Sequence, residues 1–218
     1  MQKTAVITLT ILILAITQAG SAAAFGVTAK DDPFASGRWF LGASSGLDFG
    51  MGTDIVEPED GGKTETDVLQ FGLGIYGGYF VLKGWELGPT VRYDYGSTTD
   101  ENDNVTTTGS YLAGLQTGYY YAMPVPFHPF FNIEMGYAGR SIVLDPEKGD
   151  STSDIAGGFA VRPSLGAAFF FTDKIALTPS FYFQHTALYG TDDTSGSEYN
   201  YDAASSRFGF QVGLIGIF

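Results

Sequence analysis

The chain has 218 residues, a formal net charge of −13 and no cysteine. This length suits a single domain. The absence of cysteine excludes disulfides and thiolate metal sites, and the presence of only eleven lysines and arginines argues against a nucleic-acid partner, because neutralising phosphates takes clustered cations.

The N-terminal residues have the pattern of an export signal. Lys3 supplies a short positive region, an apolar stretch follows over residues 5–16, and small residues at 22–24 offer a cleavage site. We therefore expect residues 1–24 to be a signal peptide. After it, no apolar run is long enough for a membrane helix.

From residue 39 onward, bulky apolar residues alternate with glycine and small or polar residues, the period of a β-strand. The connections alternate between tight turns at 82–84, 124–126 and 172–174 and long polar stretches near 52–66, 97–108, 142–154 and 190–204, which hold most of the acidic residues. The pattern predicts strands that run up and down between a short-turn end and a long-loop end. The eight expected strands cover residues 39–51, 69–81, 85–95, 110–123, 127–140, 158–171, 175–189 and 206–218.

The composition of the two strand faces indicates which face lies inside a closed barrel. The polar set consists mostly of Gly, Ser, Ala and Thr, which makes a poor coat for solubility but suits the narrow interior of an eight-stranded barrel. Aromatic residues gather toward both ends of the apolar set, as at lipid interfaces. The pattern predicts an all-β, eight-stranded antiparallel transmembrane barrel. The alternative is a soluble, lipocalin-like barrel that binds an apolar ligand, and it requires the opposite facing.

The few charges on the polar set fall at one height when residues are counted from the short-turn end. Buried in a narrow lumen, such charges would need one another as partners and would block the passage. A narrow channel for small polar solutes, gated by the same charges, is the alternative. The predicted lumen ionic cluster comprises Asp48, Arg92, Asp94, Glu134, Arg162 and Arg207.

Pro89, Pro163 and Pro179 fall in the interior of expected strands. Each lacks the N–H that a strand ladder needs, and lipid cannot replace the lost bond. We therefore expect bulges or local breaks beside them.

The sequence offers no convincing catalytic group. His185 belongs to the lipid-facing set, but the residue two positions on is Ala187, so a serine nucleophile is missing there. His128 lies among prolines and is expected to be a turn residue. We expect no enzymatic activity, no metal and no cofactor.

The whole chain after the signal resembles the small eight-stranded bacterial outer-membrane barrels, the family of the OmpA transmembrane domain and OmpX. In that family the short turns lie on the periplasmic side and the long loops are extracellular, and the last strand carries an assembly signal that ends on an aromatic residue. Gln211, Gly213 and Phe218 match it, whereas Gly216 occupies a position where a bulky apolar residue is usual.

This resemblance implies that residues 25–37 form a short N-terminal segment and residues 38–218 a barrel in the bacterial outer membrane. The implied partners are outer-membrane lipid, lipopolysaccharide and, during assembly, the outer-membrane insertion machinery. The implied role of the monomer is structural, with acidic external loops that interact with, or adhere to, an extracellular partner that the sequence does not identify.

Overall fold

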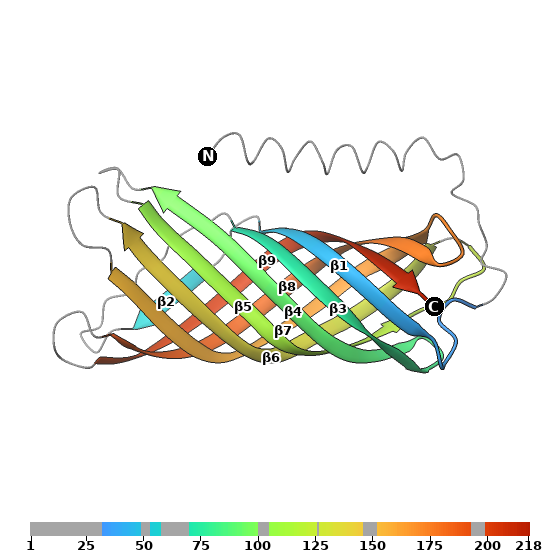
Figure 1. Ribbon diagram of the computed structural model, residues 1–218, viewed down its shortest axis with the longest axis horizontal. Helices are drawn as coiled ribbons and strands as arrows, with labels where there is room; N and C mark the ends of the chain where they lie inside the picture. Colours follow the sequence, from blue (N-terminus) through green and yellow to red (C-terminus); the bar gives the residue numbers. More distant parts are fainter. Residues whose placement is uncertain are drawn as a thin grey trace.

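The protein is a closed β-barrel, seen in a computed structural model that describes residues 32–48, 53–57, 70–99, 105–125, 127–145, 152–192 and 199–218. Figure 1 shows long strands tilted around a common axis. These described residues contain no helix that could cross a membrane. Their strands are β1 (Trp39–Asp48), β2 (Thr53–Glu57), β3 (Gln70–Leu82), β4 (Trp85–Thr99), β5 (Val105–Tyr120), β6 (Phe127–Asp145), β7 (Thr152–Phe170), β8 (Ile175–Asp192) and β9 (Tyr199–Ile217).

From β3 to β9 each strand pairs antiparallel with the next along the chain, β1 pairs with β3, and β1 also pairs with β9 to close the sheet. β9 is long enough to pair with β1 along its second half, from Phe210 to Ile217, and with β2 along its first half, from Asp202 to Ser206. β1 and β2 therefore occupy one position in the wall. The barrel wall has eight strand positions, as predicted, and β1 and β2 share the first of them.

The strands extend further at the long-loop end than the sequence pattern indicates. β2 lies within the stretch 52–66, which was expected to be a loop, and β4, β5, β6, β7, β8 and β9 all reach into the other three expected loops. The predicted strand ends at the long-loop end are wrong because a polar stretch of sequence can also form a strand. The extensions are rich in threonine and aliphatic β-branched residues, such as Thr106 to Thr108 and Ile142 to Val143, which favour extended backbone whether or not they are buried.

Large apolar side chains cover the outward face, and small or polar ones line the middle of the lumen, as predicted. Leu41, Leu73, Ile75 and Leu165 are all more than half exposed, and they lie on the face that lipid covers in a membrane barrel. The soluble barrel with an apolar interior is therefore contradicted. Exposed aromatic residues flank this belt, with Trp39, Trp85, Tyr119, Tyr121 and Phe127 toward the short turns and Tyr93, Tyr95, Tyr111, Tyr137 and Tyr189 toward the other end.

The ladder is interrupted beside each of the three prolines, which confirms the expected local breaks. Pro89 pairs with Leu115 of β5, but the pairing of β4 with β3 skips it. Pro163 and Pro179 likewise pair on one side only, because the β7–β8 ladder skips both. The register is the same before and after each gap, so the strands continue without a bulge at these points.

Candidate functional site

Arg92 of β4 organises a polar network in the middle of the lumen. Its Nη2 donates hydrogen bonds to Ser44 Oγ at 3.0 Å and to Gln211 Oε1 at 2.7 Å. Its Nη1 lies 3.9 Å from Asp94 Oδ1, and its Nε lies 3.6 Å from Glu134 Oε2. These partners come from β1, β4, β6 and β9, so one buried guanidinium connects strands from different sides of the barrel.

Arg162 of β7 is the second buried arginine and is fully shielded from solvent. It donates from Nη1 to Gln184 Oε1 at 3.2 Å and from Nη2 to Gln211 Oε1 at 2.9 Å. The guanidinium carbon also lies 3.4 Å from the centre of the Tyr182 ring, an arrangement that a cation favours. Arg162 therefore fastens β7 to β8 and β9.

The two arginines lie close together. A Cβ atom placed on Gly46 would lie 3.6 Å from Nη1 of Arg92 and 3.7 Å from Nη2 of Arg162. Their like charges repel in a medium of low polarity. The shared acceptor, Gln211 Oε1, receives a hydrogen bond from each and offsets part of that repulsion.

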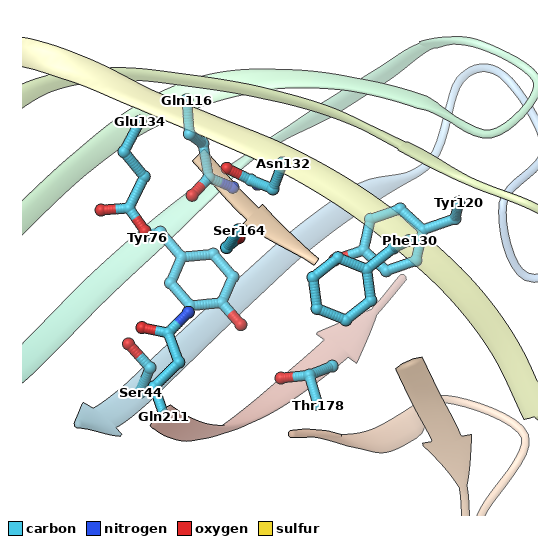
Figure 2. Close-up of a pocket in the computed structure, with 10 residues that line it drawn as sticks. All are labelled: Ser44, Tyr76, Gln116, Tyr120, Phe130, Asn132, Glu134, Ser164, Thr178 and Gln211. Atoms are coloured by element: carbon cyan, nitrogen blue, oxygen red, sulfur yellow. The ribbon is translucent and has the colours of Figure 1, made fainter. Parts of the chain in front are cut away.

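A cavity of about 20 Å³ lies between this network and the short-turn end, with room for about one water molecule. Figure 2 shows Tyr76 between two groups of polar side chains. Two acceptors among the lining residues, Asn132 Oδ1 and Glu134 Oε2, are buried without a hydrogen-bond partner. A water in this cavity would satisfy them. The lining residues are Ser44, Tyr76, Gln116, Tyr120, Phe130, Asn132, Glu134, Ser164, Thr178 and Gln211.

Sequence reasoning missed a third carboxylate in the lumen. Glu86 is fully buried, and its Oε1 accepts hydrogen bonds from Gln116 Nε2 at 3.2 Å and from Asn132 Nδ2 at 2.6 Å. Glu86 is the second residue of β4, and it lies nearer the short turns than the level of the predicted ionic cluster. The alternation does place Glu86 on the inward face, so a search along the whole strand would have found it.

Below this layer, the short-turn end of the lumen is filled by aromatic and aliphatic side chains. Phe34, from the segment before β1, lies among them and is fully buried. His128, expected to be a turn residue, instead points into this cluster, and its ring contacts Phe34 and Phe170 edge-on. The buried members of the cluster are Phe34, Phe40, Phe80, Tyr120, Phe130, Ala168, Phe170, Ala176, Ile215 and Ile217.

On the other side of the network, a small apolar cluster lines the inner face of β5 to β8, formed by Leu112, Ala138, Ala156, Ala160 and Leu188. Beside it lies a second cavity of about 20 Å³, lined in part by Arg140, Gln184 and Arg207. Arg207, predicted as part of the central cluster, lies at this higher level.

The structure thus brings Arg92, Asp94, Glu134 and Arg162 to one region of the lumen. Asp48 ends β1, where its backbone pairs with Gln70, but its side chain lies outside the described residues. The cluster predicted from sequence is therefore placed in part, and two neutral amides, Gln184 and Gln211, join it as acceptors of hydrogen bonds from the arginines.

Of the residues predicted as an assembly signal, Gln211 and Gly213 lie on β9 beside β1, and Phe218 directly follows that strand. Gln211 and Gly213 face the lumen, whereas the side chain of Phe218 is 66% exposed. Phe218 also joins the end of the chain to the start of the barrel, because its N–H donates to Trp39 C=O at 2.9 Å and its C=O accepts from Trp39 N–H at 3.2 Å.

His185 has a hydroxyl neighbour that the sequence did not reveal. Its Nδ1 lies 3.0 Å from the Oγ of Ser206, the residue opposite on β9, on the outward face. A hydrolytic pair also needs a group that orients the histidine and N–H donors for an oxyanion. No described interaction supplies the former, and the strand N–H groups pair in the ladder. Among the residues described, no group of three or more His, Asp or Glu could hold a metal ion.

Solved structures with a similar fold are outer-membrane proteins. OprG from Pseudomonas aeruginosa is 12% identical, with 86% of this chain and 99% of OprG covered and a TM-score of 0.56. AlkL is 15% identical, with 87% and 94% covered and a TM-score of 0.50. A major outer membrane protein from Thermus thermophilus is 9% identical, with 83% and 99% covered and a TM-score of 0.50. At these identities the likeness shows the fold alone.

No curated protein sequence matches the chain. Residues 10–214, however, match the family described as "Outer membrane protein beta-barrel domain", and this match spans most of the chain. The closed eight-stranded wall, its outward apolar belt and this match agree. The chain belongs to the outer membrane β-barrel family.

Proposed function

We propose that this protein is a non-enzymatic, monomeric element of the bacterial outer membrane, with a barrel that is braced from within and does not conduct. The observation that carries the proposal is the pair of buried arginines that share Gln211. Through them, β1, β4, β6, β7, β8 and β9 are connected across the lumen. Side chains that hold the wall together in this way also occupy the space that a solute would need.

The outward face supports lipid as the surrounding partner. Its aliphatic belt suits acyl chains, and its two aromatic girdles suit the headgroup levels, including lipopolysaccharide in the outer leaflet. The route to this membrane would be export by the signal peptide at residues 1–24, followed by recognition of Gln211, Gly213 and Phe218 by the insertion machinery.

The surface role would belong to the acidic stretches that connect the strands at the end opposite the short turns. Acidic residues concentrate there, as at Asp100, Glu101 and Asp103, which lie outside the described residues. Such a rim repels other anions and favours cationic partners. Adhesion to, or interaction with, a positively charged external surface is the role that this charge favours.

Reconstitution of the purified wild-type protein tests the proposal. A braced, closed barrel should migrate differently on a gel with and without boiling, and it should give no conductance steps in planar lipid bilayers. Regular steps from a heat-modifiable preparation would contradict the closed lumen. Identical migration with and without boiling would contradict the stable barrel itself.

One observation favours the narrow channel as a second candidate. Water-sized cavities lie on both sides of the arginine layer, and Arg162 contacts a lining residue of each, namely Gln184 and Gln211. If the protein conducts, Arg162→Ser should change the size or the ion selectivity of the steps. Wild-type conductance that this variant leaves unchanged would contradict a gate at Arg162.

A further inference from the structure

The segment that precedes β1 lies across the short-turn mouth of the barrel. Loop segments normally lie on the surface. Here, however, Phe34 is fully buried although it belongs to no strand, and Pro33 beside it is also buried. A side chain from outside the wall has therefore become part of the interior.

The ring of Phe34 lies across the mouth rather than along one side of it. It stacks on Tyr120 with ring centres 4.7 Å apart, and it contacts Phe80 at 5.6 Å, His128 at 5.1 Å and Phe170 at 5.7 Å. These four rings belong to β5, β3, β6 and β7. Because the contacts come from four different strands, removal of Phe34 would open the centre of the aromatic cluster.

Among the residues described, the hydrogen bonds and the ion pair that fasten the segment to the barrel lie on one side of it. Phe34 C=O accepts a hydrogen bond from Gly84 N–H at 2.8 Å, and Gly37 N–H donates to Phe80 C=O at 2.9 Å. Lys83 lies 2.7 Å from Asp32 in an ion pair. All three contacts are to the end of β3 and the turn that follows it. Gly37 has a φ of 93°, a left-handed conformation that turns the chain back toward β1.

The opposite side of the segment borders open space. A cavity of about 230 Å³ separates Asp32 and Pro33 from the β5–β6 turn, where it is lined by Ala122, Met123, Pro124, Val125 and His128. A segment that is attached along one edge, with room along the other, has the geometry of a lid.

We propose that residues 32–37 form a lid over the periplasmic mouth of the lumen, with Phe34 as its plug and the β3–β4 turn as its hinge side. The lid is separate from the arginine network, which blocks the lumen further in. It therefore controls access to the interior from the periplasm whether or not the barrel conducts.

The test uses a thiol placed behind the lid. The chain contains no cysteine, so Ala168→Cys introduces a unique thiol at a fully buried position in the aromatic cluster. The full chain is produced with its export signal, purified from outer membranes and treated with a charged methanethiosulfonate reagent. With Phe34 present, the thiol should react slowly. Phe34→Ala in the same background should raise the labelling rate about tenfold or more, because burial of one such ring favours the closed lid over an open one by at least that factor.

Phe127→Ala is the matched control, because Phe127 is an aromatic residue at the same end that faces outward. It should leave the labelling rate unchanged, and heat-modifiability should verify that each variant is folded. If Phe34→Ala does not fold, Phe34→Leu keeps the apolar volume without the ring contacts and should give an intermediate increase.

Two results would overturn the lid. One is an equal labelling rate with and without the Phe34 ring in folded protein, and the other is a parent thiol that already reacts as fast as in the urea-unfolded chain. Neither result bears on the absence of conductance, so failure of the lid and failure of the closed barrel can be distinguished.

Discussion

Gln211 offers the sharpest test of the idea that the barrel is braced from within. Its Oε1 accepts hydrogen bonds from both Arg92 and Arg162, at 2.7 Å and 2.9 Å. Gln211→Met keeps the length and approximate volume of the side chain but removes the acceptor. Both guanidinium groups then lose a partner in a site from which water is largely excluded.

The expected loss follows from those two bonds. A buried hydrogen bond to a charged group contributes about 1.5–3 kcal/mol, so the variant should lose about 3 kcal/mol or more of unfolding free energy. Gln211→Glu should unfold at a urea concentration at least as high as that of the wild type, because a carboxylate accepts hydrogen bonds from both arginines and also offsets their repulsion. Gln116→Met, which removes one 3.2 Å bond to Glu86, should cost about half as much as Gln211→Met.

Equilibrium urea unfolding of the refolded barrel in detergent measures these differences. Trp39 and Trp85 give the fluorescence signal, and the gel shift on boiling gives an independent one. A Gln211→Met barrel that unfolds within about 0.5 kcal/mol of the wild type, the range of an ordinary surface substitution, would refute the bracing role. Because no cellular machinery is present in this assay, a loss seen here cannot come from a damaged assembly signal.

Three further predictions concern other parts of the barrel. Phe218→Ser should lower the amount of protein in the outer membrane of cells while leaving refolding in detergent intact, and equal defects in both would contradict a signal role. Leu73→Arg, on the lipid face, should destabilise the barrel in lipid vesicles by about 2–4 kcal/mol, and an unaffected unfolding curve would contradict the facing. Although burial raises the pKa of Asp32, hydrogen bonds from Lys83 and the Phe34 N–H, together with the charges of Lys83 and His128, lower that pKa below its ordinary value. The carboxylate therefore stabilises the lid above pH 3.8, and this contribution, less than about 1 kcal/mol, is lost as the pH falls through the lowered pKa. Asp32→Asn should abolish that loss in unfolding curves recorded at successive pH values, and an unchanged pH dependence would contradict it.

The wall of the barrel could be predicted from the sequence because lipid imposes a simple rule on every strand. Residues such as Leu73 and Ile75 must face lipid, and Gly72 and Gly74, which alternate with them, leave room in a narrow lumen, so alternation alone fixes both the strand and its facing. The ends of the strands were less predictable. Beyond the membrane belt that rule no longer applies, and threonine-rich stretches pair as strands although they look like loops.

The interior was predicted only where charge marked it. Counting heights found Arg92 and Arg162 but not Gln211, which the sequence pattern assigned to the assembly signal alone, because a neutral amide does not stand out in a sequence. Phe34 was missed for a different reason. It lies in a segment with no periodicity, and its burial depends on the shape of a mouth that exists only after the strands have closed.

The prolines give the barrel an uneven mechanical character. Pro163 and Pro179 both interrupt the β7–β8 ladder, whereas the ladders on the far sides of these two strands run past the same prolines. Each gap removes cross-strand bonds without shifting the register, so the wall keeps its shape but loses stiffness along this line. Lateral pressure from the bilayer acts equally on all eight strand positions. The wall should therefore flex first at the seam between β7 and β8. Arg162 and its contacts with Gln184 and Tyr182 cross this same seam from inside, which makes the lumen network the element that limits how far it bends.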